Sequence, residues 1–374
     1  RKPASDIREI SLRSRKAQYT YLAKLAEGCT SQTAILYRDN ECILPLVDLL
    51  ERNGIPYQMR NAELSFFSHR TILDIINIIK LAQNPMDTEA FLQIYYKIGT
   101  YLRKQDAIRI ARISEEKRIP VLDVAAEDPD LNGHVLGSVR SMRTHLQNLL
   151  QDSGERALYR IMQYMGYQEY LNRSGLSDSK LEILRILGSR ADSPMELAER
   201  LEQLKVLIRE KEPDRKCPLI LSTIHASKGL EYDSVYLIDV ADGILPESIP
   251  QNLHQASAEE LKAYEEERRL FYVGVTRAKD HLTLFTTNRP STFCSEFLGK
   301  SSVTEEGRKN LMPVESRISR TFKQARPYAA VAGIRQTKAS EELYFRLKEE
   351  LGTGVIVEHK KYGEGVVTQL DDRL

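Results

Sequence analysis

Two segments in the second half of the chain gather side chains that could bind a ligand. The first, STIHASKGLEY (Ser222 to Tyr232), brings hydroxyl, imidazole, ammonium and carboxylate groups together after an apolar run. If that run is a buried strand, we expect these groups at its carboxyl end, where open α/β sheets place their ligands. The second, EEERRLFYVGVTRAKD (Glu265 to Asp280), predicts a helix whose acidic start and basic end suit the helix dipole. Taken singly, each segment favours an ordinary capped element with a solvated charge run.

Four apolar runs predict the strands that would position these segments. Near-continuous hydrophobicity, bounded by polar or turn residues, is typical of strands that are covered on both faces. The predicted strands are Thr33 to Tyr37, Leu219 to Thr223, Val235 to Asp239 and His281 to Phe285. Helical patterns follow the first run, at Leu44, Val47 and Leu50, and precede the last, from about Ala256 to Thr276. Strands that alternate with helices predict an α/β fold with a doubly wound parallel sheet.

A long helical stretch separates the first predicted strand from the other three. Its apolar pattern is helical nearly throughout and contains no convincing strand. Prolines mark its edges, Pro85 at the start and Pro213 at the end, where a change of element is expected. We therefore predict a discontinuous α/β domain, residues 1–84 and 214–297, with an all-helical domain of residues 85–213 inserted into it.

The end of the chain has a different composition. Residues 298–350 are polar and predict a linker. Its basic side chains are Arg308, Lys309, Arg317, Arg320, Lys323 and Arg326, with only Glu315 between them. Residues 351–374 contain two alternating apolar runs around Tyr362-Gly363-Glu364-Gly365, which predicts a hairpin with glycine at turn positions. We interpret this segment as the start of a small β module.

The overall composition excludes several classes of protein. The chain has 374 residues, 41% hydrophobic and 29% charged, which suggests two or three domains. A formal net charge of +1 gives no global argument for a nucleic-acid or membrane partner, so any such argument must be local. The four cysteines are too far apart in the sequence for a zinc site or a small disulfide scaffold. No apolar run approaches the ~20 residues that span a bilayer, and no signal peptide follows the basic start.

These observations predict a cytoplasmic protein with no membrane partner. The chain begins at Arg1 rather than Met, and we expect further residues before it in the complete protein. The sequence supplies no complete phosphate-binding loop, because Gly299-Lys300-Ser301 has Cys294 where the motif requires glycine. Asp239 ends an apolar strand, as a magnesium-binding Asp would, but Val240 follows where Glu is usual. We interpret Asp239 as a strand-end residue and predict no metal site within this chain.

Together, TIHASKGLEY and EEERRLFYVGVTRAKD closely resemble motifs V and VI of the superfamily 1 DNA helicases of the UvrD, PcrA and Rep family. TAILYRDN (Thr33 to Asn40) resembles motif IV of this family, and SFFSHRTILD (Ser65 to Asp74) resembles the segment after it. HKKYGEGVV resembles the start of the Tudor-like (SH3-like) module that closes PcrA-type enzymes. The resemblance covers most of the chain and is weakest in the helical insert. It implies that the sheet is a RecA-like domain of the P-loop NTPase type.

The resemblance implies an ATP site shared between two domains. Family members hydrolyse ATP in a cleft between two RecA-like domains, and this chain resembles only the second. By motif match, Arg277 and Arg38 would reach the γ-phosphate, for which the planar, always charged guanidinium is well suited. Tyr37 matches the aromatic residue that stacks on adenine, and Glu231 matches the residue that contacts the ribose. Lys228 is a candidate for a phosphate or cross-domain contact.

The resemblance also implies contacts with single-stranded DNA. Thr223 and His225 fall where motif V meets the strand, and hydroxyl and imidazole donors suit phosphate contacts without sequence information. His225 could equally have a capping or structural role. Phe66, beside Phe67, could offer a stacking surface for bases, although two adjacent aromatic residues are more often part of a core.

The helical insert gives a weaker indication of nucleic-acid contact. Family members carry a Gly-Ile-Gly hairpin that contacts duplex DNA, and here only Ile98-Gly99 remains. The basic stretch from Lys97 to Arg118 could follow phosphates, but a solvated helix face explains it more simply.

We therefore expect the C-terminal portion of an ATP-dependent 3′–5′ DNA helicase, with a role in DNA repair or replication. ATP and Mg²⁺ would be required, with the metal ligands outside this chain, and the isolated chain would be inactive. Expected partners are single-stranded DNA, single-strand/duplex junctions and an N-terminal RecA-like domain, with repair or transcription proteins possible at the C-terminal module. The alternatives are the helicase part of a helicase-nuclease and a non-catalytic DNA- or partner-binding module. Arg38, Glu231 and Arg277 argue against the last, which has no use for residues directed at a nucleotide.

Overall fold

A computed structural model of the chain shows two compact units, residues 1–302 and residues 303–374. The residues that it describes are 6–59, 65–175, 179–211, 214, 216–250, 255–287, 290–300, 356–359 and 363–366. Most of the predicted linker, with its basic side chains, lies outside the described residues.

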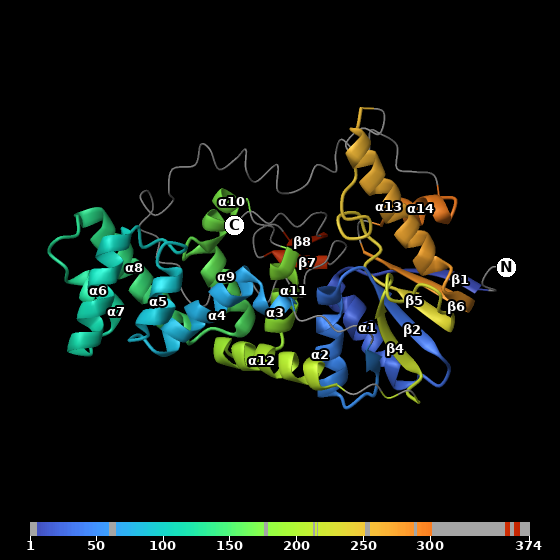
Figure 1. Cartoon of the computed structure of the whole chain (residues 1–374), viewed down its shortest axis with the longest axis horizontal. Coiled ribbons are helices and arrows are strands. Elements are labelled where there is room, and N and C mark those ends of the chain that lie inside the picture. The colour runs from blue at the N-terminus through green and yellow to red at the C-terminus, as the bar shows by residue number, and fades with distance from the viewer. Residues whose placement is uncertain are drawn as a thin grey trace. The chain divides into compact units, whose positions relative to one another are not determined.

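The first unit is built on a six-stranded sheet whose paired strands are all parallel (Figure 1). The strand order is β1-β6-β5-β2-β4-β3. The strands are β1 (Asp6–Ser11), β2 (Thr33–Tyr37), β3 (Gln58–Met59), β4 (Leu219–Thr223), β5 (Tyr232–Leu237) and β6 (Ala278–Thr286). The predicted α/β fold with a parallel sheet is confirmed. β2 and β4 have the predicted bounds, whereas β5 ends at Leu237, so Asp239 lies just beyond the strand end.

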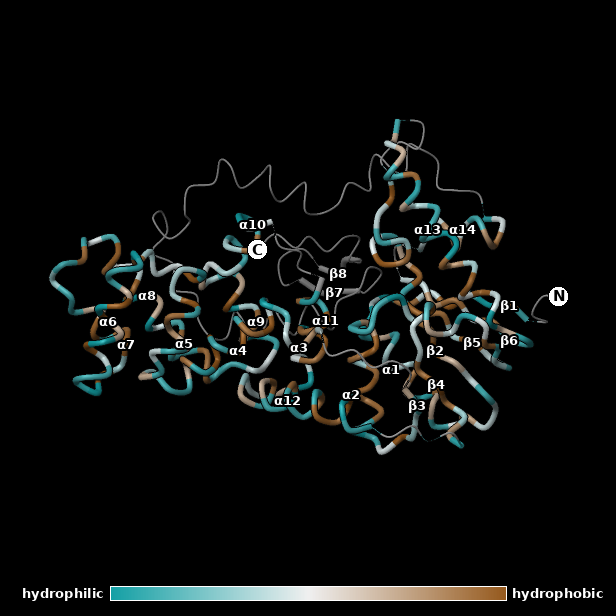
Figure 2. Tube along the Cα trace, viewed as in Figure 1, coloured by the Kyte–Doolittle hydropathy of each residue, from teal (hydrophilic) through white to brown (hydrophobic). Residues whose placement is uncertain are grey.

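Helices cover both faces of this sheet. On one face, α1 (Arg15–Glu27) and α2 (Leu44–Arg52), which follows the 3₁₀ helix η1 (Asn40–Ile43), pack on Ile35 and Tyr37 of β2. On the other, α13 (Ala258–Val275) packs on Ala34 and Leu36 of the same strand, with α14 (Thr292–Phe297) beside it. Successive strand residues point to opposite faces, so β2 contributes to both cores. Hydrophobic stretches run along the inner strands and α2 (Figure 2).

Two features fix α13, the helix predicted from the charged second segment. At its start, Ser257 and Glu260 form a capping box, in which each side chain accepts from the other residue's backbone N–H. Along its length, Tyr264, Leu270, Phe271 and Val275 are buried against the sheet. The helix begins and ends within two residues of the bounds predicted from the apolar pattern, about Ala256 to Thr276. The expected basic end of the helix is wrong, because Arg277 lies beyond it and Lys279 belongs to β6.

Between β3 and β4 the described residues form helices joined by turns and loops, without a strand. The helices are α3 (Ser65–Ser68), α4 (Arg70–Gln83), α5 (Thr88–Ile94), α6 (Lys104–Lys117), α7 (Val121–Ala126), α8 (Gly133–Leu149), α9 (Gly154–Gln163), α10 (Tyr167–Ser174), α11 (Ser179–Gly188) and α12 (Pro194–Glu210). Several begin with a side-chain cap, from Asp87, Asn132, Ser153 and Ser193. Their apolar faces join the core of α1 and α2 without a break, so a separate inserted domain with the expected boundaries stays a prediction.

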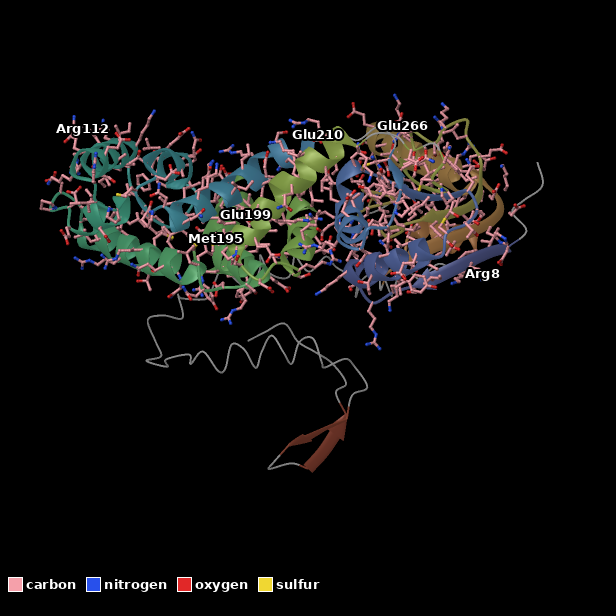
Figure 3. All side chains as sticks on the ribbon, turned by 90° about the horizontal axis from the view of Figure 1, so that it is seen from below. Arg8, Arg112, Met195, Glu199, Glu210 and Glu266 are labelled. Atoms are coloured by element: carbon pink, nitrogen blue, oxygen red, sulfur yellow. The ribbon has the colours of Figure 1, made fainter. Side chains whose placement is uncertain are left out.

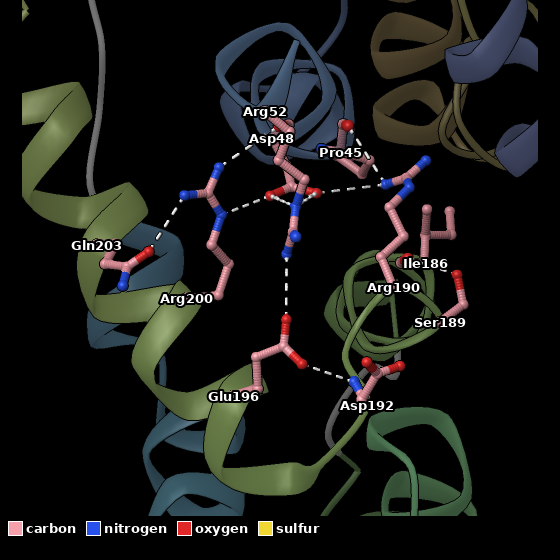
Figure 4. A network of polar contacts seen from close by, with 10 residues as sticks. All are labelled: Pro45, Asp48, Arg52, Ile186, Ser189, Arg190, Asp192, Glu196, Arg200 and Gln203. Atoms are coloured by element: carbon pink, nitrogen blue, oxygen red, sulfur yellow. Dashed lines mark hydrogen bonds and ion pairs between the residues drawn. The ribbon is translucent and has the colours of Figure 1, made fainter.

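An ionic seam joins α2 and its neighbours to α11 and α12. Acidic side chains come from residues 41–51 and basic ones from residues 180–211. The pairs are Glu41 with Lys180, Asp48 with Arg190 and Arg200, and Glu51 with Lys211. Asp48 is buried at the centre, where Arg52 of its own helix is a third cationic partner (Figure 4). The seam fixes the helical region to the sheet side by complementary charge.

In the second unit, the described residues form the antiparallel pair β7 (Ile356–His359) and β8 (Gly363–Val366). The predicted hairpin pairing is confirmed, but the placement of glycine at turn positions is wrong. Gly363 pairs with His359 and Gly365 with Val357, so both glycines belong to β8. The register keeps the two apolar runs opposite each other. The two glycines must then be residues of the strand. Whether this pair begins a Tudor-like module stays a prediction.

None of the helices in the described part of the chain has the length and apolar character that a membrane crossing requires.

Candidate functional site

Arg38 follows directly on β2, and its side chain extends to the middle of α13. Nε and NH2 donate to Oε1 of Glu267, at 3.1 and 2.8 Å, and Nε also lies 3.3 Å from Oε2. NH1 donates to Asp39 Oδ1 at 2.8 Å. The Arg38 side chain remains 18% exposed and that of Glu267 14% exposed. The guanidinium is therefore held in one orientation at the carboxyl edge of the sheet.

The charges of this cluster support one another. Burial alone would lower the pKa of Arg38, but the hydrogen bonds to Glu267 and the nearby carboxylates outweigh it and raise the pKa. Burial raises the pKa of Asp39, and the positive charge of Arg38 offsets part of that rise. Arg38 therefore stays fully charged.

Arg277 lies immediately beyond α13 and is half-buried. Its Nε donates to Val273 O at 2.9 Å, NH1 to Leu230 O at 2.8 Å and NH2 to Thr276 Oγ1 at 3.0 Å. Its own carbonyl accepts from the backbone N–H of Tyr232 at 2.9 Å. These bonds fix Arg277 against the residues that lead into β5, next to the exposed Glu231.

The residues after β4 form a tight turn. The N–H of Ile224 donates to Tyr37 O at 2.9 Å, which continues the pairing of β4 with β2. Thr223 Oγ1 accepts from Ala226 N at 3.1 Å, and Ser227 Oγ donates to Ile224 O at 2.6 Å. The buried hydroxyls thus shape the turn.

Two side chains of this turn face solvent, His225 and Lys228. Gly229, at φ +84°, then takes the left-handed conformation that glycine adopts without strain.

The expectation that all these groups gather at the carboxyl end of β4 is wrong for the carboxylate. Thr223 and His225 lie there, but Glu231 immediately precedes β5, which runs parallel to β4. Glu231 is therefore at the opposite, amino edge of the sheet, and Arg277, just before β6, is at that edge too. The motif V segment crosses from one edge to the other within a few residues. The two arginines lie at opposite edges of the sheet, and each is bonded to α13, Arg38 through Glu267 and Arg277 through Val273.

Tyr37 does not present its ring as an adenine-stacking residue would. Its side chain is fully buried on the face covered by α1 and α2, among Tyr19, Cys42 and Tyr57. Burial raises its pKa, and its hydroxyl has no hydrogen-bond partner among the described residues. The physical reason is strand alternation, which turns Tyr37 to the face opposite Arg38. In this structure the expected stacking position is part of the core.

Two of the candidates in the helical region, Phe66 and Lys97, are also internal. Phe66 is 2% exposed and packs edge-on to Phe67, with 5.5 Å between the ring centroids. Phe66 is therefore a core residue, the alternative to a stacking surface for bases. Lys97, at the start of the basic stretch, is 4% exposed, and its Nζ lies 2.6 Å from Asp74 Oδ1. Neither presents a surface for nucleic acid in this arrangement.

The residue that sequence reasoning missed is Glu267. It is one of three consecutive glutamates in a charged run, and no motif distinguished it from Glu265 or Glu266. Helical periodicity contained the signal, because Glu267 shares a face with Leu270, Phe271 and Gly274, which pack on the sheet.

No group of three or more His, Cys, Asp or Glu side chains gathers as a metal site among the described residues. Asp239 is fully buried and engaged by protein groups. Its carboxylate accepts from Arg15 at 2.9 and 2.6 Å and from Gln18 at 2.7 Å. This carboxylate therefore anchors α1 to the end of β5.

Comparison with known proteins identifies the family and the relatives that this chain resembles. The UvrD-like helicase C-terminal domain matches residues 8–289. ATP-dependent DNA helicase Rep of Escherichia coli is 30% identical over 288 residues, 70% of this chain and 40% of Rep. ATP-dependent DNA helicase PcrA of Staphylococcus epidermidis is 25% identical over 372 residues, 92% and 48% of the two chains. DNA helicase II of Haemophilus influenzae is 25% identical over 366 residues, again 92% and 48%. The chain spans less than half of the length of these curated relatives.

Proposed function

The chain belongs to the UvrD-like helicase C-terminal domain family, and we propose that it is the arginine-bearing half of the motor of an ATP-dependent 3′–5′ DNA helicase. The names of its relatives support this proposal, since they are ATP-dependent DNA helicases. The observation that carries it is the attachment of Arg38 and Arg277 to one helix, α13. A module that only binds partners has no need for two guanidinium groups held in this way.

The proposed chemistry is stabilisation of charge during ATP hydrolysis. Phosphoryl transfer spreads negative charge over the equatorial oxygens of the γ-phosphate, and an arginine directed at them lowers the barrier. We assign that role to Arg277 and Arg38. Glu231 and Lys228 are proposed to contact the ribose and a phosphate or the facing domain. Mg²⁺ would neutralise charge on the β- and γ-phosphates, with ligands and a phosphate-binding loop from another RecA-like domain.

The proposed nucleic-acid contact is the turn after β4. His225 is exposed there and can donate to a phosphate of single-stranded DNA without reading sequence. Thr223, whose hydroxyl closes the turn, is proposed to hold the backbone in shape for this contact. Action at single-strand/duplex junctions, in repair or replication, belongs to the same proposal, as does binding of repair or transcription proteins by the C-terminal segment.

The test is Arg277→Ala in the complete helicase that contains this chain. ATP turnover should fall on the order of 10³-fold, the contribution of an arginine to phosphoryl transfer, while binding of single-stranded DNA is retained. Arg112→Ala is the matched control, because Arg112 is a 72% exposed arginine on α6, away from α13 (Figure 3). Turnover equal to that of the control would remove Arg277 from the active site.

A second measurement concerns the 374-residue chain alone. We expect no ATP turnover above that of its own Arg277→Ala variant, because the sequence supplies no phosphate-binding loop. Clear turnover would contradict the division of the site between two domains. If the complete protein binds single-stranded DNA but hydrolyses no ATP, the non-catalytic module is the better description.

A further inference from the structure

Glu267 is joined to Arg38 across 229 positions of sequence. Both carboxylate oxygens take part, since Oε1 accepts from Nε and NH2 and Oε2 lies 3.3 Å from Nε. Oε2 also accepts from the backbone N–H of Glu247 at 3.4 Å. A carboxylate held on both sides in a largely buried position gives a two-point contact with a guanidinium. This contact is a rigid connection between the end of β2 and α13.

The contact occupies only one side of the guanidinium. Arginine has five N–H groups, one on Nε and two each on NH1 and NH2. Glu267 takes the side formed by Nε and NH2, and Asp39 takes one hydrogen of NH1. The remaining hydrogens of NH1 and NH2 lie at the end of the fork, and NH2 is 3.6 Å from Oε2 of the exposed Glu247. Two parallel donors at that end match the spacing of phosphate oxygens.

The helix itself fixes the position of Glu267. Leu270 and Phe271, one turn further along, are buried against the sheet, so α13 cannot rotate without breaking its core contacts. Glu265 and Glu266 point away and are exposed. Of the three glutamates, only Glu267 is placed by this packing at the end of β2.

We propose that Glu267 is a positioning residue for Arg38: it holds the Nε side of the guanidinium so that the NH1–NH2 end is presented to the terminal phosphate of a nucleoside triphosphate. This inference rests on the proposed function, because it requires a phosphate at the Arg38 site. Glu267 does not touch the nucleotide and acts only through Arg38. An arginine tethered in advance needs no reorientation when the substrate binds.

The test is a double-mutant cycle in the complete helicase, with kcat and KM for ATP measured for Glu267→Ala, Arg38→Ala and the double variant. Glu267→Ala should lower kcat on the order of 10- to 100-fold, the usual effect of losing a supporting contact, with KM changed less than about threefold. In the Arg38→Ala background, Glu267→Ala should change kcat less than about twofold, because the residue through which it acts is gone. Glu266→Ala, an exposed neighbour on the same helix, is the matched control and should leave kcat unchanged (Figure 3).

Glu267→Gln keeps the experiment decisive if the alanine variant folds poorly. Its amide oxygen can still accept from Nε–H, so kcat should fall between that of the native enzyme and Glu267→Ala at an unchanged melting temperature. Equal losses from Glu267→Ala in the native and Arg38→Ala backgrounds would overturn the inference, as would a kcat equal to that of Glu266→Ala. Failure of the proposed function has a different signature, namely full turnover in Arg38→Ala and Arg277→Ala themselves.

Discussion

Replacement of Asp48 by asparagine should destabilise the first unit more than any change to an exposed ion pair. Asp48 is 1% exposed and accepts from Arg200 Nε at 2.6 Å and from Arg52 Nε at 3.0 Å, while Arg190 NH1 lies 3.7 Å away (Figure 4). Asparagine keeps the shape and one acceptor oxygen but removes the negative charge that the three arginines share.

The magnitude follows from how much of each arginine is shielded from water. The side chains of Arg190 and Arg200 are 14% and 16% exposed, whereas Arg52 is 34% exposed and also approaches Glu196 at 3.9 Å. Arg190 and Arg200 therefore account for most of the expected loss in the free energy of unfolding. Removing one partner of a buried ion pair costs about 3 to 5 kcal/mol. Asp48→Asn should lie near the lower limit and Asp48→Ala near the upper limit, because alanine removes the acceptor as well.

The assay is urea denaturation of the chain followed by circular dichroism, with Asp130→Asn as the control. Asp130 is 72% exposed and lies 3.4 Å from Arg109, so its loss should cost less than about 1 kcal/mol. Adding Arg190→Met to Asp48→Asn should cost less than the sum of the two single changes, since it removes a charge left without its partner. A loss for Asp48→Asn within about 1 kcal/mol of the control would refute the reasoning.

Two further predictions concern packing and pH. A Cβ at Gly154 would lie 2.7 Å from Gly188 O, so Gly154→Ala should lower the free energy of unfolding by about 1 to 3 kcal/mol. Gly137 lies in a helix with open space around it, so Gly137→Ala should raise the free energy of unfolding by up to about 1 kcal/mol. Burial raises the pKa of Cys42 and of Cys294 from 9.0 to about 12. Between pH 9 and 12 the folded chain then keeps protons that the unfolded chain releases, so the free energy of unfolding should fall as the pH rises. The fall should be less steep in Cys42→Ala. Urea titrations at each pH measure both.

The strands that the sequence predicted are those whose residues are buried on both faces. β2 and β4 lie inside the sheet, every residue of both is buried, and their bounds match the apolar runs. β1 is an edge strand of mixed burial, with charged residues at Asp6, Arg8 and Glu9, and β3 pairs over only two residues. Edge strands need not be apolar, so hydrophobic runs cannot reveal them.

The site could be predicted only as a set of residues. Resemblance selected Arg38 and Arg277, but which way each side chain points depends on the register of the sheet and on α13. Strand alternation alone separates Tyr37 from Arg38, and applying it to β2 would have predicted the buried tyrosine. Helical periodicity places Glu267 on the face of α13 that meets the sheet, but its pairing with Arg38, 229 positions away in the sequence, required the tertiary structure.

A residue without any polar side chain governs how the two arginines are held. A Cβ at Gly274 would lie 3.2 Å from Leu237 Cδ1 and 3.6 Å from Ile224 Cγ2, so glycine allows α13 to approach β5 and the turn after β4 closely. Glu267, which holds Arg38, is on the same face of the helix two turns earlier, and Arg277 follows three residues later. Because α13 is one rigid element, a side chain at position 274 that displaced the helix would move both guanidinium groups together. The distance between α13 and the sheet therefore sets the geometry of the two arginines to which we assign phosphate binding.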